Sequence, residues 1–344
     1  MAKKVLEKEE SSLNRDMIKR FGDVISSADR VFRRFSDVEP LSISPSLDLA
    51  TGGLLPGTLT VISGPAKSGK STTCLQICKN AIEKNMRVLY GDFESRIRAM
   101  NLGGIEGLDL SKIEVVHSPE NENDLSAEDF LTIIESYIKN PEYKNSLIVL
   151  DSVSALIPRS ELDVDPSSTL RASLPKMLSH FYRKIAQSIV KNKITLISIS
   201  HQYQNTSGFG KLWKTSDGSY QSYQKDYSFL VKKVENLSED NFNTGLRLEW
   251  DIECTPTTSS KNSCVSYIKF GKGIDKVAEL TELGTSLSLI SKAGAWFECD
   301  FLLEREEFKN QKVKFQGILN LNEFISQNPK IYEILNQDIK EMLK

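Results

Sequence analysis

The sequence predicts an α/β protein whose core is a mostly parallel sheet covered by helices on both faces. Three observations support this fold class. Short apolar runs alternate with helical segments through the first two thirds of the chain, a glycine-rich loop joins one run to the next helix, and another run ends in an acidic residue. At 344 residues the chain can form one large core with smaller appendages.

Residues 1–40 precede this core. Apolar side chains recur at helical spacing from about Leu13 to Phe35, which predicts an amphipathic helix followed by a basic cluster. A helix outside the main core either packs on its own domain or docks on a neighbouring subunit. We therefore treat residues 1–40 as an N-terminal helix and oligomerisation segment.

The expected core covers residues 41–275. We predict its strands at 59–63, 88–90, 147–150 and 194–199, and its helices at 71–84, 125–138 and 174–191. Strands without long helices follow at 229–234, 245–252 and 264–270, which predicts an antiparallel extension of the sheet. Residues 276–344 are expected to form a small α+β C-terminal domain that ends in an amphipathic helix at 329–343.

The composition excludes several classes of protein. Apolar residues make up 39% and charged residues 26% of the chain, and no stretch approaches the ~18 apolar residues of a membrane span. The first twelve residues are too polar for a secretory signal, so we expect a cytoplasmic protein without a membrane partner. Five scattered cysteines without a CxxC pair predict neither a zinc site nor a disulfide. A net charge of −2 leaves a nucleic-acid partner open, provided that basic patches are local.

The glycine-rich loop predicts a phosphate site. The run Gly64–Ser71, GPAKSGKS, fits the pattern G-x-x-x-x-G-K-[ST] and lies between an apolar strand and a helix. Its backbone N–H groups and the helix N-terminus suit phosphates, Lys70 should reach the β and γ phosphates, and Ser71 should bind Mg²⁺. ATP and Mg²⁺ are therefore the expected cofactors. The predicted nucleotide-binding residues are Gly64, Pro65, Ala66, Lys67, Ser68, Gly69, Lys70, Ser71 and Thr72.

Acidic residues end two of the apolar strands. Asp151 closes the run SLIVLD, where a carboxylate would lie beside the loop and order the Mg²⁺ shell; a cap of the following turn is the alternative. Glu94 follows the strand VLYGD and can orient or activate the water that attacks the γ-phosphate. Asp92, two residues earlier on the same side of the strand, is a rival for that role.

Finer features of the sequence narrow the class of protein. They lie in the approach to the loop, the acidic strand with the loop after it, the next long helix and the end of the core. The segments are SLDLATGGLLPG (46–57), LIVLDSVSALIPRSELD (147–163), LPKMLSHFYRKIA (174–186), FGKGID (270–275), KAGAWF (292–297), QG (316–317) and ISQNP (325–329). In this order they resemble the RecA family of recombinases. Residues 198–211 are also similar to phage UvsX-type recombinases, so a bacteriophage member is expected, acting in the host cytoplasm.

The resemblance implies roles for individual residues. Glu94 matches the catalytic glutamate of the family. His201 matches a polar residue at a strand end that senses the γ-phosphate, and a one-residue slip would give that role to Gln202. Residues 158–173 and 203–226 match two DNA-binding loops.

Candidate DNA contacts lie on a helix and in the second loop. Lys176, Ser179 and Arg183 match helix positions that contact DNA phosphates, and their spacing places them on one helix face. The loop offers rings and cations that suit single-stranded DNA, at Phe209, Lys211, Trp213 and Lys214. Taken alone, these positions fit a solvated helix face and a surface loop better; with the resemblance, DNA contact is favoured.

Two departures from the family pattern affect the expected activity. Cys254 and Pro256 occupy positions where the family places a basic pair that reaches the γ-phosphate of a neighbouring subunit. We therefore expect weak hydrolysis unless Lys261 or Lys272 substitutes. The tract after Glu94 also lacks the aromatic residue that the family places under adenine.

The resemblance implies an ATP-dependent recombinase. It would form filaments with copies of itself on single-stranded DNA and pair it with duplex DNA in recombination and repair. Single-strand-binding and mediator proteins are further candidate partners. One alternative is a RecA-like accessory protein that binds ATP and DNA with little hydrolysis. A ring helicase is the other, and the C-terminal resemblance argues against it.

Overall fold

A computed structural model describes most of the chain, and it divides the chain into two compact units, residues 1–39 and 40–344. The described residues are 12–22, 25–30, 39–95, 104–119, 125–162, 173–204, 213–215, 225–239, 242–256, 263–303, 305–309 and 312–342.

Helix α1 of the first unit spans Ser12–Phe21 and is shorter than the sequence predicts. The expected helix to Phe35 is wrong, because residues 25–27 are not helical. Gly22 follows α1 with φ of 81°, and its N–H donates to the carbonyl of Ile18 (2.9 Å). A glycine in the left-handed region ends helices, since it closes the last turn without a Cβ clash.

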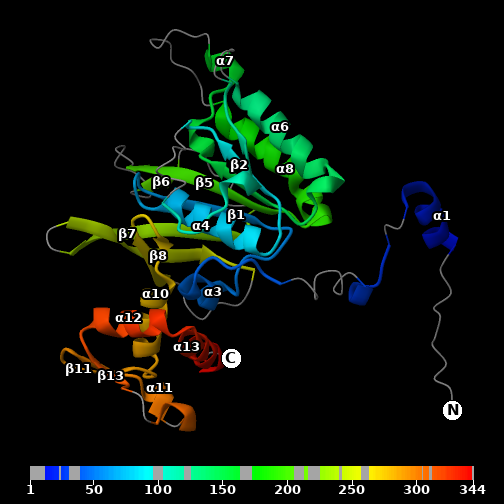
Figure 1. Ribbon diagram of the computed structural model, residues 1–344. Helices are drawn as coiled ribbons and strands as arrows, with labels where there is room; N and C mark the ends of the chain where they lie inside the picture. The colour runs from blue at the N-terminus through cyan, green and yellow to red at the C-terminus, as the bar shows by residue number, and fades with distance from the viewer. Residues whose placement is uncertain are drawn as a thin grey trace, which may run out of the picture. The chain divides into compact units, whose positions relative to one another are not determined.

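The second unit contains a ten-stranded sheet whose central strands run parallel (Figure 1). The parallel part has the order β7-β1-β5-β4-β2-β3. Its strands are β7 (Tyr227–Glu239), β1 (Leu59–Gly64), β5 (Thr195–Gln204), β4 (Leu147–Asp151), β2 (Val88–Asp92) and β3 (Ile113–Val116). The predicted fold class is confirmed.

Antiparallel strands extend the sheet beyond β7, as predicted. They are β8 (Phe242–Cys254), β9 (Ser263–Lys269) and β10 (Gly273–Ile274), and β6 (Trp213–Thr215) pairs antiparallel with the end of β5. The predicted strands at 229–234, 245–252 and 264–270 correspond to β7, β8 and β9. The first of them differs from the prediction, because β7 pairs parallel with β1 and antiparallel only with β8.

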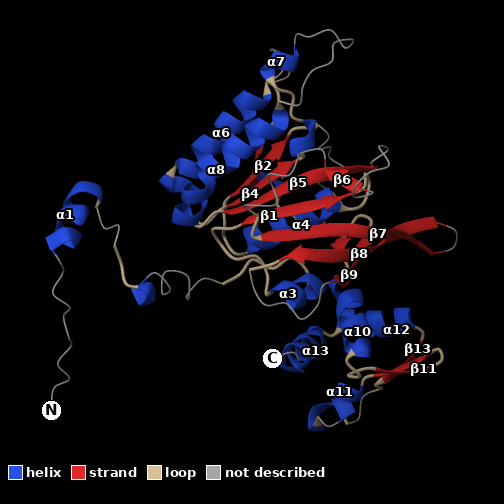
Figure 2. Cartoon of the chain, turned by 180° about the vertical axis from the view of Figure 1, so that it is seen from behind, coloured by secondary structure: helices blue, strands red, loops and turns tan. Residues whose placement is uncertain are grey.

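Helices cover both faces of the sheet, and Figure 2 shows α6 and α8 side by side on one of them. The apolar side chains of α6 (Ala127–Lys139) and α8 (Leu174–Asn192) form one core, and those of α3 (Pro45–Thr51) and α4 (Lys70–Glu83) belong to the other. Neighbouring residues of β4 divide between the cores: Val149 faces the α4 side and Leu150 the α6 side. Successive side chains of a strand point to opposite faces of the sheet. Because both faces are buried here, the sequence of these strands is continuously apolar.

The C-terminal part of the second unit has its own apolar core and a three-stranded sheet. Its elements are α10 (Lys276–Ser286), β11 (Ser291–Ala293), β12 (Trp296–Glu298), α11 (Asp300–Leu303), β13 (Lys314–Gln316), α12 (Ile318–Gln327) and α13 (Pro329–Met342). The boundary near residue 276 stays a prediction. Short elements elsewhere are α7 (Arg159–Leu162) and 3-10 turns at Leu110–Lys112, Pro141–Tyr143, Val153–Ala155 and Glu306–Phe308.

No helix within the described ranges combines the length and apolar character needed to cross a membrane.

Candidate active site

The predicted phosphate loop connects the fully buried strand β1 to α4. Gly69 precedes the first residue of α4 with φ of 77°, and a Cβ there would lie 2.7 Å from Cδ1 of Ile268 on β9. A Cβ at Gly64 would lie 2.9 Å from Cβ of Val231 on β7. Both ends of the loop therefore favour glycine, because β7 and β9 pack directly against them.

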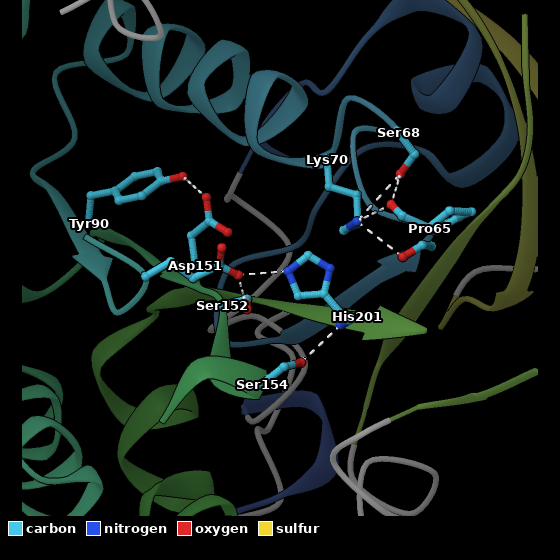
Figure 3. Close-up of polar contacts among 10 residues, drawn as sticks. Pro65, Ser68, Lys70, Tyr90, Asp151, Ser152, Ser154 and His201 are labelled. Carbon is cyan, nitrogen blue, oxygen red and sulfur yellow. Dashed lines mark hydrogen bonds and ion pairs between the residues drawn. The ribbon is translucent and has the colours of Figure 1, made fainter. Parts of the chain in front are cut away.

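Lys70 is folded back onto the loop that precedes it (Figure 3). Its Nζ donates to the carbonyl oxygens of Gly64 (3.1 Å) and Pro65 (2.6 Å) and to Oγ of Ser68 (3.4 Å). The side chain is buried, and burial lowers the pKa of its ammonium group, while Asp151 and Glu94 act in the opposite direction. Phosphate oxygens could replace the loop carbonyls as partners of a lysine held in this position.

Asp151 lies at the end of β4 and meets Ser71, the first residue after Lys70. Its carboxylate forms a hydrogen bond with the Ser71 hydroxyl, and Oδ2 accepts one from the Tyr90 hydroxyl (2.6 Å). Burial raises the pKa of Asp151, the two hydrogen bonds lower it, and the nearby carboxylates of Glu94 and Asp92 raise it further. The structure thus brings together the two residues predicted to bind Mg²⁺.

The donor set beside the loop suits Mg²⁺. It consists of hydroxyl and carboxylate oxygens, the ligands that this hard cation prefers. Across the described ranges, no cluster of three or more His, Cys, Asp or Glu side chains could hold a metal ion. Mg²⁺ commonly binds through one or two protein oxygens together with phosphates and water, so Ser71 and Asp151 fit a site that nucleotide phosphates complete.

Glu94 joins the ends of three strands through hydrogen bonds. Its Oε1 accepts from the Ser152 hydroxyl (2.7 Å) and lies 2.7 Å from Nε2 of His201. The backbone N–H of His201 in turn donates to Oγ of Ser154 (3.0 Å), and His201 is in register with Gly64 of β1. The carboxyl ends of parallel strands meet at one sheet edge, which is where α/β proteins bind ligands.

The paired residues between which the sequence left the roles open differ in their surroundings. Asp92 is buried and lies in register with Asp151, whereas Glu94 is half-buried and contacts His201. Gln202 follows His201 on β5 and pairs with Thr215 of β6, so its side chain points to the other face of the strand. The structure therefore brings Glu94 and His201 together.

The candidate DNA contacts are described only in part. Lys176 and Arg183 are exposed on α8, and the half-buried Ser179 accepts a hydrogen bond at its carbonyl from Nε of Arg183 (3.3 Å). Phe209 and Lys211 lie outside the described residues. For Trp213 and Lys214 the structure gives only backbone pairing, with Gln204 and Tyr203 of β5.

The positions of the expected basic pair carry no positive charge. Cys254 ends β8, and its Sγ lies 3.4 Å from the carbonyl oxygen of Asp226. Pro256 is exposed. Of the possible substitutes, Lys272 is exposed in the turn after β9, and Lys261 lies outside the described residues.

Three residues of this network were missed by the sequence analysis: Tyr90, Ser152 and Ser154. Their hydroxyl groups bond Asp151, Glu94 and the backbone of His201. Two signals were present in the sequence: hydroxyl residues follow Asp151 in DSVS, and Tyr90 interrupts an apolar strand. Neither signal identifies a partner without the strand register.

Comparisons with known proteins identify similar sequences. The family model described as the RecA N-terminal domain matches residues 6–275. Protein RecA of Campylobacter hominis is 24% identical over 343 residues, 99% of this chain and 92% of that protein. Protein RecA of Sulfurovum sp. is 24% identical over 324 residues (94% and 88%), and that of Thermotoga neapolitana is 28% identical over 318 residues (89% and 85%).

Proposed function

Because the chain belongs to the RecA family, we propose that it is an ATP-dependent recombinase that assembles on single-stranded DNA and promotes homologous pairing and strand exchange. The observation that carries this proposal is the meeting of Lys70, Ser71, Asp151 and Glu94 at one edge of the sheet. Near full-length similarity to proteins named RecA supports the same function.

The loop Gly64–Thr72 would bind the phosphates of ATP. Lys70 would exchange its carbonyl partners for β and γ phosphate oxygens, and Ser71 and Asp151 would hold Mg²⁺. The bound cation would neutralise negative charge on the phosphates during transfer. Tight packing of β7 and β9 against the loop keeps its N–H groups in place, so little reorganisation accompanies the reaction.

Glu94 would orient the attacking water. As water bonds to the γ-phosphorus and the bond to the ADP oxygen breaks, the carboxylate of Glu94 would accept a proton that then passes to solvent. Ser152 and His201 hold this carboxylate from β4 and β5. Beyond His201, β5 continues into the residues that pair with β6. His201 would therefore transmit the state of the γ-phosphate to the predicted DNA loop.

The exposed cations of α8 would bind DNA phosphates, and residues 203–226 would bind bases. Further proposed partners are duplex DNA, other copies of the chain, and single-strand-binding and mediator proteins. The exposed ring of Phe21 on α1 suits docking between copies. We place this work in the cytoplasm, where the DNA of the bacteria that carry the related proteins lies.

A second candidate function has one observation in its favour. No positive charge is present at Cys254 and Pro256, and an arginine-finger contact contributes roughly 10³–10⁵ in rate. A chain without that contact could bind ATP and DNA, hydrolyse little, and support another recombinase.

ATP hydrolysis with and without single-stranded DNA separates these functions. We expect strong stimulation by DNA, its loss in Lys70→Ala, and strand exchange between homologous DNA molecules in the presence of ATP. Binding of ATP and DNA without hydrolysis or strand exchange would favour the accessory role. A protein that binds neither would overturn both proposals.

A further inference from the structure

Tyr90 places a hydroxyl group in the interior of the sheet. The residue is the third of β2, and its side chain is 0% exposed. The strand residues before it, Val88 and Leu89, are apolar and equally buried. Phenylalanine would fill this core position without a polar atom, so the hydroxyl needs a reason of its own.

The hydroxyl has a specific partner. It donates to Oδ2 of Asp151 at 2.6 Å, from the neighbouring strand (Figure 3). The register of β2 with β4 pairs Tyr90 with Val149 and Asp92 with Asp151, so the phenol reaches diagonally along the sheet to the strand end. Asp151 is then held from one side by Tyr90 and contacted by Ser71 from α4.

We propose that Tyr90 is a positioning residue for Mg²⁺ binding, whose hydroxyl fixes the Asp151 carboxylate in the orientation that meets Ser71 and the cation. The inference rests on the proposed nucleotide site. A carboxylate ligand has two oxygens and free rotation about its terminal bond, and a partner that occupies one oxygen restricts the other. Loss of such an outer partner commonly lowers metal affinity about 10–100-fold.

Tyr182 supplies a matched control. It is also buried, at 2% exposed, and its hydroxyl donates to Oγ of Ser198 at 2.9 Å. That pair lies between α8 and β5, within the core under α6 and α8. Tyr90→Phe and Tyr182→Phe therefore each remove a buried phenol hydroxyl that donates to a side chain.

The test is the Mg²⁺ dependence of nucleotide binding, measured with the full chain and a fluorescent N-methylanthraniloyl analogue of ATP. We expect Tyr90→Phe to raise the Mg²⁺ concentration for half-maximal binding about tenfold, without changing affinity in excess EDTA. Tyr182→Phe should leave both values unchanged. An unaltered Mg²⁺ requirement in Tyr90→Phe, or an equal loss of affinity with and without Mg²⁺, would overturn the inference. Failure of the wild-type chain to bind the analogue would instead count against the proposed function.

If the Tyr90→Phe protein does not fold, a second pair of variants tests the inference. The double variant Tyr90→Phe/Asp151→Ala leaves no buried carboxylate without its donor, and it is compared with Asp151→Ala alone. If Tyr90 acts through Asp151, the two variants require the same Mg²⁺ concentration, because removing the partner removes the effect. A further increase on adding Tyr90→Phe would show that the tyrosine acts elsewhere.

Discussion

Glu94 and His201 meet at 2.7 Å, between Oε1 of the carboxylate and Nε2 of the imidazole. The residues are 107 positions apart in the chain and come from the ends of β2 and β5, with β4 between them. Ser152, directly after β4, donates its hydroxyl to the same oxygen. Oε1 is therefore held by two neighbouring strands, which fixes the carboxylate at the sheet edge beside the phosphate loop.

Glu94→Gln should slow hydrolysis while preserving nucleotide binding. The amide keeps the shape of the side chain and an oxygen for Ser152, but it cannot accept a proton from water. General-base contributions are typically about 10²–10⁴ in rate, so we expect kcat to fall at least about 100-fold with nucleotide affinity within a few-fold. Steady-state ATPase and equilibrium binding assays measure the two effects. Glu83→Gln, on the exposed end of α4, is the control; an unchanged kcat in Glu94→Gln would refute the assigned role.

The phosphate loop was predictable in detail because its chemistry is local. Glycine spacing, the preceding apolar strand and the following helix all lie within about thirty residues of sequence. The contact of Glu94 with His201 was not predictable in the same way, since it depends on strand order and register. Tyr90 was missed for another reason: in an apolar strand a tyrosine resembles any other core side chain, and only its partner reveals the hydroxyl.

Helix ends and loops mark the limits of the sequence analysis. Apolar residues recur at helical spacing beyond Gly22, so the sequence predicted a longer helix than α1, which ends before this glycine. The sequence of residues 203–226 shows neither strand nor helix periodicity. The positions of its aromatic and basic side chains therefore could not be inferred. Their assignment to DNA depends on the family resemblance.

Gly69→Ala should cost more stability than Gly271→Ala. Both glycines have φ near 78°, so alanine is strained at each by about 1–2 kcal/mol. Only at Gly69 would the new Cβ meet neighbours, Cδ1 of Ile268 at 2.7 Å and Cδ1 of Leu248 at 3.1 Å; nothing lies within 4 Å at Gly271. Overpacking adds about 1–3 kcal/mol. Urea unfolding measures the difference in the free energy of unfolding, and equal losses would contradict the packing of β8 and β9 on the loop.

Removing the exposed cations of α8 should weaken binding to single-stranded DNA without regard to base sequence. Each lost phosphate contact reduces the slope of log K against log salt by about 0.7, so Lys176→Ala/Arg183→Ala should reduce it by about 1.4. Fluorescence anisotropy with a labelled oligonucleotide at several salt concentrations measures this slope. Lys112→Ala/Lys139→Ala removes the same charge from exposed positions elsewhere and should leave it unchanged. Equal effects of the two double variants would refute a DNA-binding face on α8.

Restoring positive charge at the end of β8 should accelerate hydrolysis in the DNA-bound assembly. Cys254→Lys/Pro256→Lys places two cations, two residues apart, at the positions that the resemblance matches to the family's basic pair. Because such a contact is worth roughly 10³–10⁵ in rate at its best, we expect at least a tenfold rise in kcat. Thr255→Lys, which adds a cation between the two positions, is the control. A rise without DNA, or none with it, would show that this position does not face a neighbouring nucleotide.

Glu279 predicts how stability changes with pH. The carboxyl group is 0% exposed on α10, and Oε2 accepts a hydrogen bond from the backbone N–H of Ser46 (2.9 Å). Burial raises its pKa from 4.5 to about 7, against the effect of hydrogen bonds with Ser46, Ser44 and Ser266, and Asp48 raises it further. The folded state therefore holds the proton more tightly than the unfolded state. Its stabilising contribution is complete below pH 4.5 and is lost as the pH rises through 7.

Glu279→Gln should remove this pH dependence, because the amide keeps an oxygen for Ser46 and carries no charge. At about 1.4 kcal/mol per pH unit, the variant should gain about 2–3 kcal/mol over the wild type between pH 5 and pH 8. Urea unfolding gives the free energy of unfolding of both proteins at each pH. The difference between variant and wild type is then compared at the two pH values, so that the contributions of other titrating groups cancel. Glu333→Gln, on the exposed face of α13, should show no such gain. A gain in both variants, or in neither, would mean that Glu279 does not hold its proton more tightly in the folded state.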